Sequence, residues 1–414
     1  MSNIVISNIY GKYNLGDLAI RNSALRVMNE LFTDQTLTLL CEDLEGFPFE
    51  KGTVNLTEEF YSPYGFVIKS KTTTAQPVLI KLLRLIWVLV GTFVFAALGK
   101  LSPALLPSRG FFTYVTRIKT ARVVFLMGGG YLVSRNHIKD TLGLLLNILP
   151  ILVAKWFGKS VIILPISYGP YYNWVHSWLA GWAIKNTHLI CRDLISLAKA
   201  QVCNPQAIFL PDLALYDWQP SAQRVSHRNQ KDAYFVLTVK NYFNLNKQVA
   251  IEKEFADFIS YVWKKHGLKC VFIPTGANPI EENDIPTGER LREKVGSKIL
   301  KIEIPKTPEA THEIIKNARL AVCTRMHSAI FSAVVFTPFI AIAYEHKVKG
   351  LMELLKLKDW ILPLDGITKS ELISLFDKLT TARVHQKYVD QLKQDRSKIL
   401  SQRQALKTYI LANI

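Results

Sequence analysis

The stretch CTRMHSAIFSAVVFTPFIAIAYEHKVKGL, residues 323–351, decides the fold class of this chain. Residues 318–323 are an apolar run typical of a buried strand, and residues 325–327 begin a helix with an apolar run behind them. Residues 339–343 form a second apolar strand, which ends in a group of polar side chains. A strand, a helix and a second strand in this order predict a βα unit on a parallel sheet.

Polar side chains follow the end of each of these two strands. Arg325, Met326 and His327 open the helix after the first strand, and Tyr344 and Lys347 follow the second. Ligands of open α/β sheets bind at the carboxyl ends of the strands, so we expect these polar side chains to face one crevice. Free N–H groups in the first helical turn suit a phosphate or carboxylate, and an Arg side chain adds a fork for planar anions. In the alternative interpretation, Arg325 pairs with a surface carboxylate and His327 is structural.

The length and the cysteine pattern limit the possible classes of protein. A chain of 414 residues is longer than one hydrophobic core usually supports, which favours two domains of about 200 residues each. The five cysteines lack the spacing of a disulfide framework or a zinc site, so we expect a reducing cytosol and no metal. The chain begins directly with an apolar strand, residues 4–9, and we expect no signal peptide.

Units of a strand, a turn containing glycine or proline, and a helix recur along the chain. The N-terminal units comprise residues 4–32, 123–156 and 160–184, and a fresh series starts at residue 233. This alternation predicts an α/β protein with two doubly wound Rossmann-like domains that face a cleft, an arrangement that resembles the two-domain GT-B glycosyltransferases.

Composition shifts suggest the domain boundaries. We expect an N-terminal domain at residues 1–215, a polar linker at residues 216–231, and a C-terminal domain at residues 232–369. Residues 370–414 are charged and helical in pattern and form a C-terminal extension. Residues 60–119 are a basic and apolar insertion in the N-terminal domain.

Positive charge is concentrated in one segment. The formal net charge is +18, and residues 60–139 hold eleven Lys and Arg but no Asp or Glu. Residues 85–98 within it are fourteen uncharged residues, about 21 Å long as a helix, whereas a membrane span needs about 20 residues. This composition favours a segment that dips into an anionic membrane surface over a buried core helix. Nucleic-acid binding is disfavoured because the basic residues surround an apolar run.

Glycine-containing turns follow two other strands. Their candidate substrate-binding residues are Asn14, Gly16, Asp17, Gly128, Gly129 and Gly130. Gly16 permits close approach of a ligand to the backbone, and Asn14 or Asp17 can cap the following helix or contact a sugar hydroxyl. The triple glycine leaves bare backbone at a strand end, but it is not a nucleotide-binding fingerprint.

The order of the short motifs is more specific than any one of them. The chain carries NLGD at 14–17, GGG at 128–130, PISYGP at 165–170, RD at 192–193, PD at 211–212, TRMHS at 324–328 and YEHK at 344–347. This ordered set resembles the polysaccharide pyruvyl transferase family over nearly the whole chain. The sequence departs from the family pattern in two places, because no early carboxylate follows the triple glycine and the basic insertion is longer than a minimal member needs.

The resemblance implies an activity and roles for single residues. Members of the family transfer the pyruvyl group of phosphoenolpyruvate onto sugar hydroxyls, usually as a cyclic ketal, and release phosphate. By this resemblance Arg192 and Arg325 bind the carboxylate and phosphate of the donor, His327 transfers the proton, and Lys347 adds a phosphate contact. The donor is expected on the C-terminal domain, and a glycan or lipid-linked glycan acceptor on the N-terminal one.

The resemblance and the charge pattern together predict a cellular setting. We expect a role in exopolysaccharide or cell-wall synthesis, without a cofactor. We also expect a cytoplasmic protein that is peripheral on the inner face of the cytoplasmic membrane.

The residue types suit this chemistry. Phosphoenolpyruvate carries about three negative charges on few atoms, which calls for Arg forks and helix-end amides more than for a metal. Protonation of its methylene makes C2 an electrophile for a hydroxyl, and a histidine is suited to donate that proton. Two alternatives stay open: a glycosyltransferase that uses a nucleotide sugar on the same fold, and a non-catalytic scaffold at the membrane surface.

Overall fold

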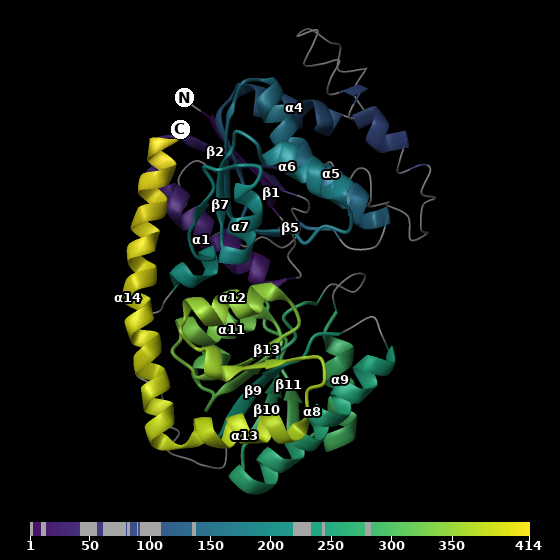
Figure 1. Cartoon of the computed structure of the whole chain (residues 1–414), viewed down its shortest axis with the longest axis vertical. Coiled ribbons are helices and arrows are strands. Elements are labelled where there is room, and N and C mark those ends of the chain that lie inside the picture. The colour runs from purple at the N-terminus through teal and green to yellow at the C-terminus, as the bar shows by residue number, and fades with distance from the viewer. Residues whose placement is uncertain are drawn as a thin grey trace. The chain divides into compact units, whose positions relative to one another are not determined.

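The computed structural model divides into two compact units (Figure 1). The residues that it describes are 3–9, 14–41, 56–60, 80, 83–88, 90–91, 109–134, 138–217, 233–241, 245–277 and 283–414. Unit 1 comprises residues 1–12, 20–213 and 404–414, and unit 2 comprises residues 13–19 and 214–403.

Two short segments belong to a different unit from the one that the sequence suggests. Residues 13–19 belong to unit 2, where the backbone of Asn14 forms an antiparallel bridge with Gly276. Residues 404–414 belong to unit 1, where Oγ of Ser160 donates a hydrogen bond to the carbonyl oxygen of Asn413 at 2.9 Å. The helices that contain these segments, α1 (Leu15–Leu31) and α14 (Ala382–Ala412), therefore have residues in both units.

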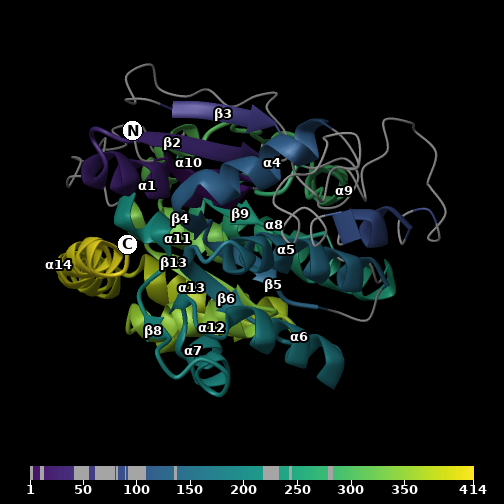
Figure 2. The ribbon, with the colours of Figure 1, turned by 90° about the horizontal axis from the view of Figure 1, so that it is seen from above.

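Unit 1 is built on an eight-stranded sheet with the order β3-β2-β1-β4-β6-β7-β8, in which β5 also pairs with β6. Its strands are β1 (Asn3–Ile9), β2 (Thr36–Cys41), β3 (Leu56–Phe60), β4 (Ala121–Leu126), β5 (Gly129–Leu132), β6 (Ser160–Tyr168), β7 (His188–Cys191) and β8 (Ile208–Phe209). All of the pairings are parallel. Figure 2 shows the strands following one another across the sheet from β3 to β8.

The helices of unit 1 cover its sheet and bury its apolar strands. They include α4 (Arg109–Thr120), α5 (Ile138–Trp156), α6 (Trp174–Ile184) and α7 (Leu194–Gln201). Strands β1, β4 and β6 are almost continuously buried, as expected for a parallel sheet that is covered by helices on both faces.

Unit 2 is built on a six-stranded parallel sheet with the order β11-β10-β9-β12-β13-β14. Its strands are β9 (Tyr234–Thr238), β10 (Lys269–Phe272), β11 (Leu300–Ile302), β12 (Ala321–Cys323), β13 (Phe339–Ala343) and β14 (Ile361–Pro363). Its helices are α8 (Leu245–His266), α9 (Ile285–Val295), α10 (Pro308–Lys316), α11 (Met326–Val334), α12 (His346–Leu354), α13 (Lys369–Thr380) and most of α14. The predicted α/β class with two parallel-sheet domains is confirmed.

Two segments of unit 1 that were expected to be turns are partly strands. Strand β6 continues through Pro165 of the PISYGP motif to Tyr168, and Gly129 and Gly130 of the triple glycine begin strand β5. The register of β6 against β7 shifts between Ile163 and Ile166, and such a bulge accommodates a proline inside a sheet.

The apolar run at residues 85–98 lies only partly within the described residues. The described part is helical, and it places Leu85 and Val88 in the hydrophobic core of unit 1. Trp87 and Val90 on the same helical stretch are about half exposed. Within the part of the chain that the structure describes, no helix has the length and apolar character needed to cross a membrane.

Candidate active site

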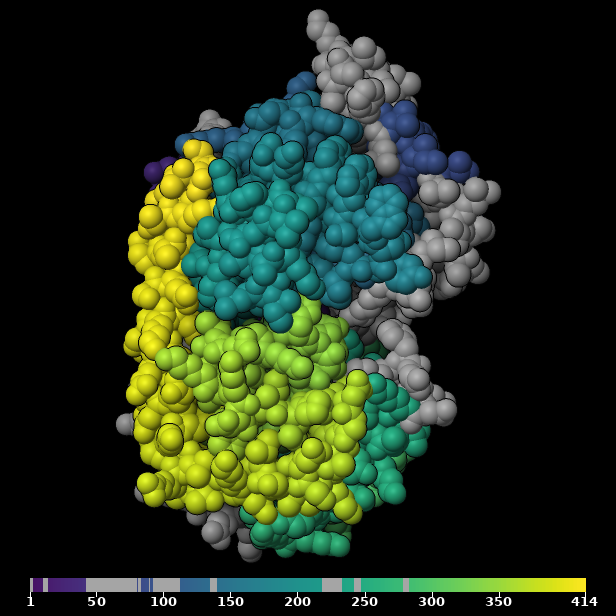
Figure 3. Space-filling model, viewed as in Figure 1, coloured from purple at the N-terminus to yellow at the C-terminus, as the bar shows by residue number. Residues whose placement is uncertain are grey.

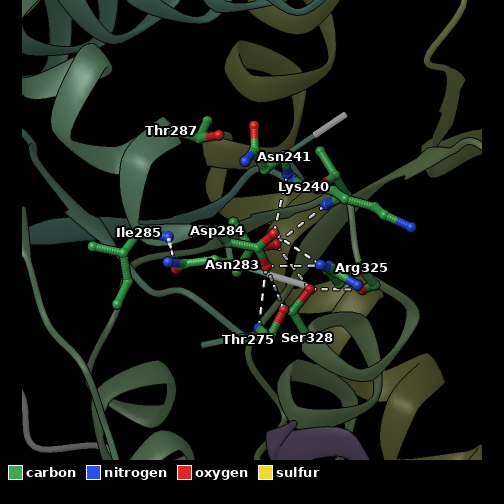
Figure 4. A network of polar contacts seen from close by, with 12 residues as sticks. Lys240, Asn241, Thr275, Asn283, Asp284, Ile285, Thr287, Arg325 and Ser328 are labelled. Atoms are coloured by element: carbon green, nitrogen blue, oxygen red, sulfur yellow. Dashed lines mark hydrogen bonds and ion pairs between the residues drawn. The ribbon is translucent and has the colours of Figure 1, made fainter. Parts of the chain in front are cut away.

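The candidate residues of unit 2 lie at the carboxyl ends of its central strands (Figure 4). The chain order reverses between β9 and β12, which run side by side in the middle of the sheet. Open parallel sheets bind ligands at such a topological switch point. The polar network of unit 2 is therefore where the fold favours a ligand.

Asp284 is the centre of this network. Its carboxylate accepts hydrogen bonds from Nη2 of Arg325 at 2.8 Å and from Nε of Arg325 at 3.2 Å. The backbone N–H groups of Asn241 and Gly276 also donate to it, each at 3.1 Å. Asp284 is 1% exposed and Arg325 is 9% exposed. The carboxylate thus joins the segments that follow β9, β10 and β12 and fixes the orientation of the guanidinium.

This pairing bears on the role predicted for Arg325. Two of its nitrogens are engaged by Asp284, so the fork predicted for the donor is used within the protein. The alternative that Arg325 pairs with a surface carboxylate is not what the structure shows, because Asp284 is buried. A direct contact between Arg325 and a substrate stays a prediction.

Buried hydroxyl groups connect β9, β12 and the start of α11. Oγ1 of Thr238 lies 2.9 Å from Oγ of Ser328 and accepts a hydrogen bond from the N–H of Thr324 at 3.2 Å. Oγ1 of Thr324 accepts from the N–H of Lys240 at 2.8 Å, and Oγ of Ser328 donates to the carbonyl oxygen of Arg325 at 2.6 Å. These bonds satisfy the polar groups at the switch point and make the turn into α11 rigid.

His327 lies in the first turn of α11 and packs against the backbone of Gly16. A Cβ atom added at residue 16 would lie 2.0 Å from Nδ1 and 2.2 Å from Cγ of His327, far inside van der Waals contact. Only glycine therefore fits at position 16 while the imidazole keeps this place. The NLGD turn and the TRMHS helix start, which are about 300 residues apart, meet within unit 2.

Asn14 holds the turn that contains Gly16. Its Oδ1 accepts hydrogen bonds from the N–H of Gly16 at 2.9 Å and from the N–H of Asp17 at 3.4 Å. The N–H of Leu15 donates to the carbonyl oxygen of Thr275 at 3.1 Å. Of the two capping residues that the sequence offered, Asn14 makes the cap. Asp17 lies in the first helical turn, where a negative charge is favourable.

Two lysines lie close to the ring of Tyr344, directly after β13. Nζ of Lys240 lies 4.6 Å from the ring centroid and Nζ of Lys347 lies 5.7 Å from it. Lys347 also forms an ion pair with Glu345 at 2.7 Å. Lys240 is 7% exposed, a low value for a lysine. The structure brings Tyr344 and Lys347 to the same edge of the sheet as Arg325, as predicted from the strand ends.

The helices that follow β12 and β13 begin without a side-chain cap. Neither Arg325, before α11, nor Glu345, before α12, accepts a hydrogen bond from the first helical turn. Thr307 and Thr368, by contrast, cap α10 and α13. The first-turn amides of α11 and α12 are therefore not used by the side chain of the cap residue, and a helix start of this kind suits an anion. Met326 is buried in the first turn of α11 and can contribute only packing.

Arg192 of unit 1 is also held by a buried carboxylate. Its Nη1 pairs with Oδ2 of Asp212 at 2.6 Å, and its Nε donates to Oγ of Ser167 at 2.8 Å. The neighbouring Asp193 caps α7 by accepting a hydrogen bond from the N–H of Ser196 at 2.7 Å. The RD and PD motifs thus form one ion pair at the carboxyl end of the sheet of unit 1. The donor-binding role of Arg192 stays a prediction.

The triple glycine of unit 1 lies against this pair. A Cβ atom at Gly130 would lie 3.3 Å from Nη2 of Arg192, and one at Gly128 would lie 2.6 Å from the carbonyl oxygen of Pro165. Gly129 has a φ of +139°, which side chains rarely adopt. The glycines therefore serve close packing between neighbouring segments, and the bare backbone that they leave lies beside the Arg192 guanidinium.

The cysteines next to the two arginine motifs are poor nucleophiles. Burial raises the pKa of the Cys191 thiol to about 12, and burial also raises the pKa of the Cys323 thiol to about 12. Neither provides a thiolate at neutral pH. Among the residues that the structure describes, no group of three or more His, Cys, Asp and Glu side chains could hold a metal ion.

Sequence reasoning missed Lys240 and Asp284. Lys240 directly follows an apolar strand, so the rule that placed Tyr344 at a strand end could have placed it too. Asp284 stands before Ile285 and Pro286, a position typical of a helix start, which gives no sign of a partner for Arg325. The pairing itself joins residues 41 positions apart and has no local signal.

The fold is that of the two-domain α/β proteins of the GT-B type. Anabaena HepE in complex with UDP-glucose has 10% sequence identity and a TM-score of 0.60, with 100% of both chains covered. The UDP-GlcNAc 2-epimerase from Neisseria meningitidis bound to UDP-GlcNAc has 9% identity and a TM-score of 0.56, also with 100% of both chains covered. A putative UDP-N-acetylglucosamine 2-epimerase from Listeria monocytogenes has 12% identity and a TM-score of 0.55, covering 100% of this chain and 97% of that one. Likeness at these identities shows the fold alone.

The sequence itself gives the family. None of the curated proteins matches the chain significantly. The family profile of polysaccharide pyruvyl transferase matches residues 14–346, from the NLGD turn to the YEHK segment. The chain belongs to the polysaccharide pyruvyl transferase family and is a transferase, as the ordered motifs predicted.

Proposed function

We propose that this protein transfers the pyruvyl group of phosphoenolpyruvate onto hydroxyls of a glycan and releases phosphate, and that unit 2 binds the donor. The observation that carries the proposal is the place of His327. Its imidazole lies against the Gly16 backbone, and His327 stands two residues after Arg325, at the switch point of the sheet. Family membership supplies the reaction class, and this geometry supplies a proton-transfer group.

The surroundings of His327 suit a small, highly charged anion. The first-turn amides of α11 and α12 offer N–H donors at the positive ends of two helix dipoles. Lys240 and Lys347, both close to the ring of Tyr344, add two ammonium groups at the same edge. We assign the phosphate of the donor to these lysines and amides, and its carboxylate to the guanidinium group of Arg325.

The reaction follows from these assignments. His327 donates a proton to C3 of phosphoenolpyruvate, which becomes a methyl group, and C2 becomes electrophilic. A sugar hydroxyl attacks C2 and forms the first C–O bond. The C–O bond to phosphate then breaks, phosphate leaves with the bonding electrons, and a second hydroxyl forms the ketal. Of the two hydroxyl protons, one restores the imidazolium and the other leaves with phosphate. The lysines and helix amides stabilise the departing phosphate.

We assign the glycan acceptor to unit 1. The exposed backbone of Gly130 offers hydrogen-bonding groups to sugar hydroxyls at the carboxyl end of that sheet. A lipid-linked glycan fits the basic segment at residues 60–139, which suits an anionic membrane surface. On this proposal the protein acts at the inner face of the cytoplasmic membrane in exopolysaccharide or cell-wall synthesis.

The test is release of phosphate from phosphoenolpyruvate by the purified protein, with and without a panel of glycan acceptors. We expect release that depends on an acceptor and that falls by about 10²-fold or more in His327→Ala, the usual scale for a lost acid or base. His266→Ala is the matched control, because His266 pairs with Asp377 at 2.7 Å between α8 and α13. Equal turnover of His327→Ala and the wild type would remove His327 from the mechanism.

The structural neighbours supply the competing donor class. Two of them are complexes with UDP-glucose and UDP-GlcNAc, which makes a nucleotide sugar the alternative. The same acceptor panel should therefore be offered with UDP-glucose or UDP-GlcNAc in place of phosphoenolpyruvate. Release of UDP, with no release of phosphate from phosphoenolpyruvate, would replace our proposal with a glycosyltransferase.

A further inference from the structure

Helix α6 of unit 1 presents a row of exposed tryptophans. Trp174, Trp178 and Trp182 follow one another at intervals of four residues and therefore share one face of the helix. Their exposed fractions are 78%, 60% and 49%, and the rings of Trp178 and Trp182 stack with centroids 6.5 Å apart. Together they expose on the order of 400 Å² of aromatic surface, about the size of the largest apolar patch on a typical soluble monomer, and such patches are often functional.

Buried residues beside and opposite the tryptophan row fix α6 to the core of unit 1. A Cβ atom at Gly181 would lie 2.6 Å from Sγ of Cys203, so the helix packs closely on the segment after α7. Nδ1 of the buried His176 lies 2.9 Å from Oγ of Ser134. At the C-terminal end, Nζ of Lys155 donates to carbonyl oxygens of the last turn, including that of Ala183 at 2.7 Å. The tryptophan face is therefore held outward on a rigid helix.

Basic residues at the C-terminal end of α6 indicate its partner. Helix α6 contains no Asp or Glu, Lys185 is its C-cap, and Nζ of Lys155 from α5 lies at its last turn. Residues of α5 to α7 form a broad part of the surface of unit 1 in Figure 3. A second copy of this chain, with the same net charge of +18, would be repelled by such a surface. An anionic lipid surface attracts it, and tryptophan is the side chain enriched at membrane–water interfaces.

We propose that the Trp174–Trp178–Trp182 face of α6 docks on an anionic lipid bilayer, with its rings at the level of the headgroups. This surface lies outside the basic insertion at residues 60–119. Its geometry is that of a helix lying in the plane of the interface rather than crossing it. Apolar contact by the rings holds the protein at the membrane, and the basic side chains select anionic lipid. The proposal is independent of the reaction and is tested without substrate.

The experiment measures sedimentation of the full chain with vesicles of phosphatidylcholine and phosphatidylglycerol, and with vesicles of phosphatidylcholine alone. We expect binding to the anionic vesicles at low salt. The triple variant Trp174→Gln, Trp178→Gln, Trp182→Gln should bind at least about tenfold more weakly, because only the electrostatic attraction is left. The control variant Val249→Gln, Ile304→Gln removes two exposed apolar side chains of unit 2 and should bind as the wild type does.

A second measurement does not depend on how the variant folds. Vesicles whose acyl chains carry bromine near the headgroup should quench the tryptophan fluorescence of the wild-type protein. Absence of wild-type binding to anionic vesicles at low salt overturns the proposal. Undiminished binding by the triple variant also overturns it, and assigns binding to residues outside α6. Conversion of a wild-type dimer into a monomer by the triple variant, without vesicle binding, makes the face a contact between copies and also overturns it.

Discussion

Replacing Gly16 with alanine tests the contact between the NLGD turn and His327 without touching the histidine itself. The new Cβ would lie 2.0 Å from Nδ1 of His327, whereas ordinary contact begins at 3.4 Å, so the imidazole must move by about 1.4 Å. A misplacement of about 1 Å at a reacting group can cost about 10²-fold in rate. We expect a loss of turnover of this order and a loss of about 1–3 kcal/mol in the free energy of unfolding, as for other overpacked sites.

The assay is acceptor-dependent release of phosphate from phosphoenolpyruvate, with thermal unfolding measured on the same samples. Gly181→Ala is the control, since its Cβ would lie 2.6 Å from Sγ of Cys203 in unit 1. It should destabilise the protein to a similar extent and keep most of the activity. The double variant Gly16→Ala, His327→Ala should be no slower than His327→Ala alone, because both changes act on one group. Wild-type turnover in Gly16→Ala, or fully additive losses in the double variant, would refute the reasoning.

Three further predictions concern the ion pairs. Asp284→Asn leaves the buried Arg325 guanidinium without the carboxylate of Asp284. Chemical denaturation should show a loss of about 3–5 kcal/mol in the free energy of unfolding. A loss below about 1 kcal/mol would contradict the buried pairing of Arg325 with Asp284. Arg192→Lys keeps the charge but loses the planar fork, so the melting temperature should fall despite the conservative change, and an unchanged value would argue against the pairing. For Asp377, burial raises the pKa, but hydrogen bonds from a lysine, a tyrosine and a histidine outweigh this and leave its pKa below its usual range. Its stabilising effect is therefore present at neutral pH and is lost as the pH falls through the folded-state pKa, so Asp377→Asn should be less stable than the wild type at pH 7 and equal to it in strong acid.

The sequence predicted the elements that have a strong apolar pattern. Residues 339–343 are the strand that was expected, and the helix after Arg325 begins at Met326, because both segments are buried on all sides and read as continuous apolar runs. Strands β11 and β14 were not predicted. They are three residues long and lie at the two edges of the sheet, so partial exposure removes the apolar signal.

The sequence predicted only some of the residues of the candidate site. Arg325, His327, Tyr344 and Lys347 were found because each follows a strand end within a few residues. The partner of Arg325 was not found, since Asp284 reaches it only after β9, β10 and β12 align in the sheet. The contact of His327 with Gly16 likewise depends on a segment near the N-terminus joining unit 2.

Transfer of labelled carbon tests the central claim most directly. Phosphoenolpyruvate labelled with ¹³C at C2 is incubated with the purified protein and a glycan acceptor in deuterated water, and the glycan is examined by NMR. The proposed function predicts a labelled ketal carbon on the sugar, with solvent deuterium in the adjacent methyl group, and neither product in His327→Ala. A glycan without label, together with UDP released from a nucleotide sugar on the same acceptor, would contradict it.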